Sequence, residues 1–242
     1  DAAGNVLHRN FTTYLIANEL SSRDETVKIN SQKLRVLRFA PGSFDKAKWT
    51  VKQWNVLDGL KVNGAGSGFF EYRIPWPSDL KTEDIEYASL KMELSAKQLF
   101  GKDKDGTEKQ DGDFMLGEGT YDPSLNRNSY PMTDEVKYPS IVRLRVSGQS
   151  VGDFELPDDS GDHRGILSWY SQRRDRQLRE TGSYGSLVTA YIPGDTLKES
   201  YKKKTIVVRL EVDDSIAGGL AVYGERFGRY PIDPSIIIKL KD

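Results

Sequence analysis

The sequence predicts an all-β protein, an antiparallel β-sandwich of jelly-roll type. Three observations lead to this prediction. About ten short segments are rich in β-branched and aromatic residues or alternate apolar with polar ones, which is typical of half-buried strands. Clusters of glycine, proline, asparagine and aspartate separate these segments. No segment has the length and period of an ordinary helix, so two packed sheets are the expected architecture.

The first half of the chain is expected to alternate strands with glycine- and proline-rich turns. Residues 49–60 could instead form a short helix or an irregular loop, because their Trp and Leu side chains can share one side. Gly64, Gly66 and Gly68 precede a strand rather than a helix, so they predict a loop that needs positive φ or close backbone packing, and not a phosphate site. Residues 78–84 favour a short helical turn. The expected strands are 12–17, 27–29, 34–39, 69–74 and 88–94.

The second half is expected to repeat strands around one long decorated loop. Residues 141–146 and 151–156 read as a hairpin joined by a tight turn at 147–150. A loop dense in aromatic and charged residues follows from 158 to 184. Strands are then expected at 185–192, 205–212, 222–223 and 236–238, with a Pro-Gly corner at 193–194. Residues 102–113 and 122–138 are polar enough to be surface loops.

Composition predicts a single domain over residues 1–242, because a sheet-rich chain of this length can bury one core. Lysine plus arginine number 35 and aspartate plus glutamate 36, a balance that argues against nucleic-acid and membrane partners. The absence of cysteine excludes disulfides and thiolate chemistry. No apolar run approaches the roughly 20 residues that span a bilayer. Composition does not settle the compartment.

The loop that holds Asp162, His163 and Arg164 invites a catalytic interpretation, since it contains one of the two histidines of the chain. Neither Ser168 nor Ser183 lies in a nucleophile elbow, however, and no strand carries closely paired carboxylates for glycoside hydrolysis. The same residues would either pin the loop by hydrogen bonds or contact sugar hydroxyls. The sequence predicts no cofactor. EF-hand spacing is absent, although oxygen ligands scattered over loops leave a structural Ca²⁺ open.

The tryptophans carry two alternative interpretations. Trp49, Trp54, Trp76 and Trp169 all lie in or beside expected loops. Exposed rings there would stack on the apolar faces of sugar rings. A tryptophan beside a sheet can equally cap the core, and the sequence leaves both interpretations open.

Six stretches carry a family resemblance, namely residues 54–64, 68–72, 162–169, 182–185, 218–224 and 228–234. Together they resemble an accessory β-sandwich domain of glycoside hydrolases of family 2, the β-galactosidase-type enzymes, and the general form is similar to galactose-binding-like jelly rolls. The resemblance covers most of the chain. It implies a non-catalytic module, because the family's catalytic carboxylates sit in a separate barrel domain. As part of such an enzyme, the chain is expected to be secreted or periplasmic.

The expected function is therefore that of an accessory or carbohydrate-binding module. Its partners would be a poly- or oligosaccharide, bound weakly, and the catalytic domain of the parent enzyme. One alternative is a purely structural domain that packs on the catalytic barrel, and another is a free-standing polysaccharide lyase or hydrolase. The expected sugar contacts are Asp162, His163, Arg164, Trp169 and Tyr184 on the long loop, and Tyr223, Arg226, Arg229 and Tyr230 near the C-terminus.

Overall fold

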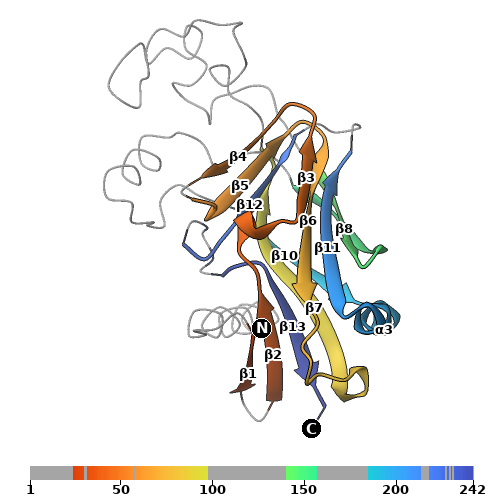
Figure 1. Cartoon of the computed structure of the whole chain (residues 1–242). Helices are drawn as coiled ribbons and strands as arrows, with labels where there is room; N and C mark the ends of the chain where they lie inside the picture. Colours follow the sequence, from red (N-terminus) through yellow and green to blue (C-terminus); the bar gives the residue numbers. More distant parts are fainter. Residues whose placement is uncertain are drawn as a thin grey trace, which may run out of the picture.

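The computed structural model describes residues 24–29, 32–56, 58–97, 140–156, 185–213, 218–226, 228, 230 and 232–241. Two β-sheets face each other across a shared apolar core (Figure 1). All strand pairs among these residues are antiparallel. The prediction of an all-β sandwich is confirmed. Its finer description as a jelly roll stays a prediction.

The larger sheet has eight strands and is built around β7 (Ile85–Ser95). Its other strands are β1 (Asp24–Ile29), β2 (Gln32–Arg38), β4 (Lys52–Val56), β5 (Lys61–Ala65), β10 (Ser186–Ile192), β12 (Leu220–Tyr223) and β13 (Ser235–Leu240). β10 pairs with one side of β7. On the other side, β13 pairs with the first part of β7 and β12 with its last residues. The sheet therefore forks beside β7, with β2 and β1 beyond β13, and β5 and β4 beyond β12 (Figure 1).

The smaller sheet has five strands in the order β3–β6–β11–β8–β9. They are β3 (Lys46–Trp49), β6 (Gly68–Pro75), β11 (Thr205–Val212), β8 (Ser140–Val146) and β9 (Gln149–Leu156). Ser147 and Gly148 join β8 to β9 with φ of 50° and 92°. Two consecutive left-handed residues match the twist of a tight hairpin, so the turn predicted in this region is confirmed.

Alternation along the strands explains why the two sheets pack together. Leu90, Met92 and Leu94 of β7 are fully buried in the core. Lys91 and Glu93 lie between them, so they point to the outer face of the larger sheet, because successive strand residues face opposite sides. β11 in the smaller sheet shows the same alternation of buried and half-buried positions. The sandwich core therefore follows from the period of two that the sequence displays.

Glu93 is a buried acid at the fork of the larger sheet. Its side chain is 0% exposed. One carboxylate oxygen accepts a hydrogen bond from the backbone N–H of Gly185 at 2.6 Å, and the other accepts one from the N–H of Tyr230 at 2.8 Å. A Cβ atom on Gly228 would lie 2.0 Å from the same carboxylate. Glu93 thus joins the start of β10 and the segment before β13 to the central strand.

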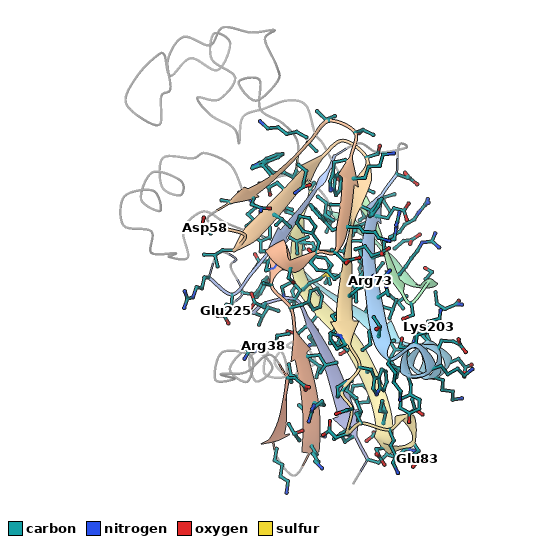
Figure 2. The ribbon with its side chains drawn as sticks, in the orientation of Figure 1. Arg38, Asp58, Arg73, Glu83, Lys203 and Glu225 are labelled. Atoms are coloured by element: carbon teal, nitrogen blue, oxygen red, sulfur yellow. The ribbon has the colours of Figure 1, made fainter. Side chains whose placement is uncertain are left out.

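An ion pair also lies beside the fork. The Arg38 guanidinium at the end of β2 lies 3.6 Å from the carboxylate of Glu225, which follows β12 (Figure 2). Asp233 accepts a hydrogen bond from the backbone N–H of Glu225 at 3.0 Å. These contacts link the two branches of the sheet where no strand pairing joins them.

One α-helix is described, and it contradicts the expectation that the chain has no helix of ordinary length. α3 (Gly194–Lys203) begins after Pro193 and ends at Lys204, whose φ of 54° is a left-handed helix end. Asp195 lies in the first turn, and lysines occupy the last turn, in the order that the helix dipole favours. The hydrogen bond and charge of Lys198 lower the pKa of Asp195. No helix of the described residues is long and apolar enough to cross a membrane.

α3 escaped the sequence prediction because it is short and mostly polar. Among its hydrophobic side chains, only Leu197 is fully buried, at 3% exposure. The ring of Tyr201 packs edge-on against Trp76, with 5.6 Å between centroids. A helix held by so few apolar contacts has no long hydrophobic stripe to find. Its detectable signals were Pro193 before the first turn and the lysines at the end.

Residues 49–60 also differ from the expectation of a helix or irregular loop. β3 ends at Trp49, β4 spans residues 52–56, and residues 58–60 form a turn, so half of this segment is strand. The Trp49 ring packs on Phe70, with 5.1 Å between centroids. A Cβ atom on Gly64 would lie 2.0 Å from the same indole. Pairing with β6 and β5, which lie elsewhere in the sequence, decides the extended conformation here.

Of the three clustered glycines, Gly66 lies in a loop as predicted, whereas Gly64 lies within β5 and Gly68 begins β6. Gly66, between β5 and β6, has a φ of 82°. A Cβ at this position would also lie 2.3 Å from the hydroxyl oxygen of Thr50. The residue therefore serves a tight connection between strands.

Removing the Glu93 carboxylate should destabilise the fold. Glu93→Ala leaves two buried N–H groups without their acceptor, so we expect the free energy of unfolding to fall by about 3 kcal/mol. Glu93→Gln keeps the shape and one acceptor and should cost about half as much. Urea unfolding followed by tryptophan fluorescence measures both. Glu155 is an exposed strand glutamate, and Glu155→Ala is the matched control. Equal stability of the two alanine variants would show that the Glu93 hydrogen bonds do not stabilise the fold.

Candidate binding pocket

The sequence-predicted contact residues fall into two groups. Those that lie outside the described residues are Asp162, His163, Arg164, Trp169, Tyr184 and Arg229. Tyr223, Arg226 and Tyr230 are described, and they lie near the fork of the larger sheet. Arg226 is exposed and Tyr230 is half-buried.

Tyr223 is fully buried, at 0% exposure. Its hydroxyl shares a hydrogen bond of 2.9 Å with the hydroxyl of Ser95. The ammonium of Lys61, 1% exposed, lies 4.6 Å from the ring centroid. Tyr223 also pairs across the strands with Glu93. Its ring has no exposed face on which a sugar could stack.

Two of the four tryptophans pack into the fold. Trp76 is 5% exposed, and its indole N–H donates to the carbonyl of Leu80 at 2.8 Å. Trp49 packs against the core. Trp54 is half-buried on β4. Of the two interpretations of the tryptophans, capping of the core describes Trp49 and Trp76.

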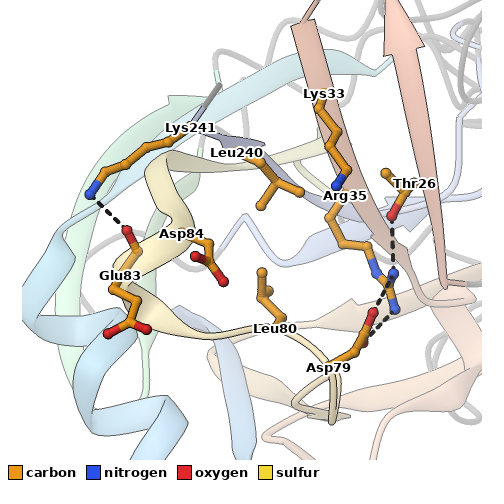
Figure 3. A pocket seen from close by; sticks show the side chains of 9 residues that line it. All are labelled: Thr26, Lys33, Arg35, Asp79, Leu80, Glu83, Asp84, Leu240 and Lys241. Atoms are coloured by element: carbon orange, nitrogen blue, oxygen red, sulfur yellow. Dashed lines mark hydrogen bonds and ion pairs between the residues drawn. The ribbon is translucent and has the colours of Figure 1, made fainter.

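A pocket of about 530 Å³ opens at the opposite end of the larger sheet, below the fork in the view of Figure 1. This volume lies in the usual range for small-molecule sites. Figure 3 shows Leu80 and Leu240 between two groups of charged side chains. The lining residues are Thr26, Lys33, Arg35, Asp79, Leu80, Glu83, Asp84, Leu240 and Lys241.

The pocket forms where the apolar interior of the sandwich ends. β2 becomes steadily more exposed from Leu37 back to Gln32. Arg35 and Lys33 continue the face that carries Leu37, because every second strand residue points the same way. The loop between β6 and β7, which includes the 3₁₀ turn η2 (Thr82–Asp84), supplies the facing wall. One side of a single sheet thus changes from core to polar pocket.

Arg35 organises one wall of the pocket. Its guanidinium donates to Thr26 at 3.0 Å, to Asp24 at 2.9 Å and to the two oxygens of Asp79 at 3.1 and 3.2 Å. Partial burial opposes the charge, but bonds and charges from Asp24 and Asp79 outweigh it, and the pKa of Arg35 lies above its ordinary value. The planar fork of arginine suits this bridging. Arg35 thereby joins β1, β2 and the loop that precedes β7.

The remaining charged side chains of the pocket are partly engaged and partly without a partner. The Lys241 ammonium donates to the backbone carbonyl of Glu83 at 2.7 Å, and the Glu83 carboxylate lies 3.5 Å from the ammonium of Lys81. Among the residues that the structure describes, the side chains of Lys33 and Asp84 make no hydrogen bond or ion pair. One free cation and one free anion therefore face a pocket whose other charges are already engaged.

This arrangement suits a neutral, hydroxyl-rich ligand. Lysine and arginine donate to hydroxyl oxygens, and carboxylates accept from hydroxyl hydrogens. The three cations and three carboxylates of the lining balance each other. In the described part of the chain, no group of three or more metal-ligating side chains is placed to hold an ion. This pocket was not predicted from the sequence, because its residues come from four separate segments.

Comparisons with known proteins identify no family. No family model and no curated protein matches the sequence. Among solved structures, the chain is similar to a cycloisomaltooligosaccharide glucanotransferase of Paenibacillus sp. in complex with cycloisomaltoheptaose. The TM-score is 0.33 and the identity 11%, and the match covers 77% of this chain and 17% of that one. The chain thus spans a small part of that enzyme, and so weak a likeness carries no argument about function.

Replacing Arg35 should loosen the pocket wall. Arg35→Met leaves Asp24 and Asp79 without their shared donor, and we expect the free energy of unfolding to fall by about 2 kcal/mol. Arg35→Lys keeps the charge but not the planar fork, so its loss should be intermediate. Thermal and urea unfolding at matched salt measure the effect. A Met variant as stable as the parent would show that Arg35 does not hold these segments together.

Proposed function

We propose that this chain is a non-catalytic carbohydrate-binding module of a secreted or periplasmic, multidomain glycoside hydrolase. The resemblance to accessory domains of family 2 enzymes motivates the proposal. The observation that carries it is the polar pocket, in which free Lys33 and Asp84 face a space of sugar size. The balance of donors and acceptors there suits hydroxyl groups better than a charged or apolar ligand.

The lining residues indicate which contacts a bound sugar would make. Lys33 would donate to ring or hydroxyl oxygens, and Asp84 would accept from a hydroxyl. Leu80 and Leu240, which are 5% and 8% exposed, line the pocket and would contact the apolar edge of the sugar. Arg35 and Asp79 are held by each other, so they would shape the wall rather than reorient. Among the described charged residues that line the pocket, only the side chains of Lys33 and Asp84 are without a partner and ready to bond a sugar, so affinity should be weak.

A second candidate is a purely structural domain that packs on the catalytic barrel of a parent enzyme. Two observations favour it. The pocket lining contains no aromatic ring, and Trp49 and Trp76 serve the core instead of an open cleft. This candidate predicts no response to any sugar and a specific association with the neighbouring domain.

Calorimetric titration separates the two candidates. The probes are galactose, glucuronate, rhamnose and plant cell-wall oligosaccharides, each tested with the full chain. We expect measurable heat from at least one of them. Lys33→Met and Asp84→Asn should each weaken that binding about tenfold, because the first removes a charged donor and the second replaces a charged acceptor with a weaker neutral one.

Matched controls lie on other surfaces of the sandwich. Lys48 on β3 and Asp58 in a turn are exposed, so Lys48→Met and Asp58→Asn should leave binding unchanged. No heat from any probe, with an unchanged melting temperature, would favour the structural candidate. Turnover of a polysaccharide by the isolated chain would overturn the non-catalytic assignment.

A further inference from the structure

Two exposed tyrosines lie side by side on the outer face of the larger sheet. Tyr191 on β10 is 60% exposed and Tyr87 on β7 is 40% exposed. β10 and β7 are adjacent antiparallel strands (Figure 1). Within the described residues, the one other large hydrophobic side chain with comparable exposure is Val51, which lies in the turn between β3 and β4. The tyrosine pair is therefore a local feature of this face.

The strand register places three polar side chains around Tyr191. Ser89 is its direct cross-strand partner, and Lys91 pairs with Thr189. Tyr87 and Lys91 lie two residues to either side of Ser89, so both are diagonal neighbours of Tyr191. Such neighbours are within reach of aromatic and long side chains. We call these five residues the tyrosine face.

Lys91 is the charged residue among these five. A second ammonium, that of Lys239 on β13, lies 5.8 Å from the Tyr87 ring centroid but is paired with Glu86 at 2.8 Å. The Lys91 side chain is half-buried, and burial lowers the pKa of its ammonium. Across the described part of the chain, Lys91 makes no hydrogen bond or ion pair. A partly desolvated cation without a counter-ion is unfavourable. An anionic group placed beside Lys91 would relieve this cost.

The size of the tyrosine face argues for a small ligand rather than a protein. A stable protein interface buries about 800 Å² on each partner. Two tyrosine rings bordered by serine, threonine and lysine supply far less apolar surface than that. Aromatic rings with flanking hydroxyl and charged groups match a sugar ring, which has an apolar face and a polar rim.

We propose that the tyrosine face is a second carbohydrate site and that it binds an acidic sugar, a uronate unit of an oligosaccharide. The ring of Tyr191 stacks on the sugar, and Tyr87 contacts the next unit along the chain. The sugar carboxylate lies against the Lys91 ammonium, and Ser89 and Thr189 bond hydroxyl groups. This inference rests on the proposed function. It adds a ligand class that the charge-balanced pocket does not select.

Titration with an oligogalacturonate and with its carboxyl-reduced, neutral form tests the site. We expect binding of the acidic form, and at least a fivefold weaker response to the neutral form. Tyr191→Ala and Lys91→Met should each reduce affinity for the oligogalacturonate at least fivefold. Tyr191→Phe keeps the ring and should bind within twofold of the parent. Lys48→Met is the matched charge control.

Stability measurements separate binding from folding. Lys91→Met removes a half-buried, unpaired charge, so its melting temperature should equal or exceed that of the parent. A loss of affinity in this variant therefore reports on the ligand and not on misfolding. Equal binding of the acidic and neutral forms would refute the selection of a uronate.

The two sites fail in distinguishable ways. If the oligogalacturonate binds, but only Lys33→Met and Asp84→Asn weaken it, the tyrosine face is not a site and the proposed function stands. If Tyr191→Ala and Lys91→Met alone weaken it, the second site is supported. If no sugar of any kind binds, both the second site and the proposed function are overturned.

Discussion

The buried carboxylate of Glu93 is the contact on which the larger sheet depends. β7 cannot pair with β12 and β13 over the same residues, so the sheet must divide beside it. At that division Glu93 accepts hydrogen bonds from two backbone N–H groups that belong to other segments. A buried charge is tolerated only when its hydrogen-bonding capacity is met. The same requirement therefore holds β10 and the segment before β13 in place.

Both candidate sites follow from this arrangement of the larger sheet. The branch formed by β13, β2 and β1 extends past the apolar core, and its inner face becomes the polar pocket. β10, on the unforked side of β7, brings Tyr191 beside Tyr87 on the outer face. One sheet thus presents a balanced charged pocket on one face and an aromatic surface on the other. The smaller sheet serves chiefly to bury the inner face of the larger one.

Much of the fold was predictable because its signals are local. Strand alternation in residues 34–39, 141–146 and 205–212 corresponds to β2, β8 and β11. The turn at Ser147 and Gly148 and the glycine loop around Gly66 also follow from short-range rules. The helix at 194–203 was missed because it is short and its buried face is built partly from Thr196 and Ser200, which are polar and do not mark a hydrophobic face in the sequence. Residues 49–60 were expected as a helix or loop, but the hairpin of β4 with β5 and the pairing of β3 with β6 make much of this segment extended.

The candidate sites were harder to predict, since they join residues that are far apart in the chain. Arg35 meets Asp79 across 44 positions, and Tyr223 lies buried beside Ser95 across 128. Nothing local distinguishes Tyr223, which is buried, from Tyr191, which is exposed. By itself, the sequence determined the all-β class, the strand periods and the turns, because these depend on neighbouring residues. The tertiary structure alone decided which polar side chains, such as Glu93, are buried and hydrogen-bonded and which face solvent. The reason is that strand pairing sets the burial and the partners of each side chain.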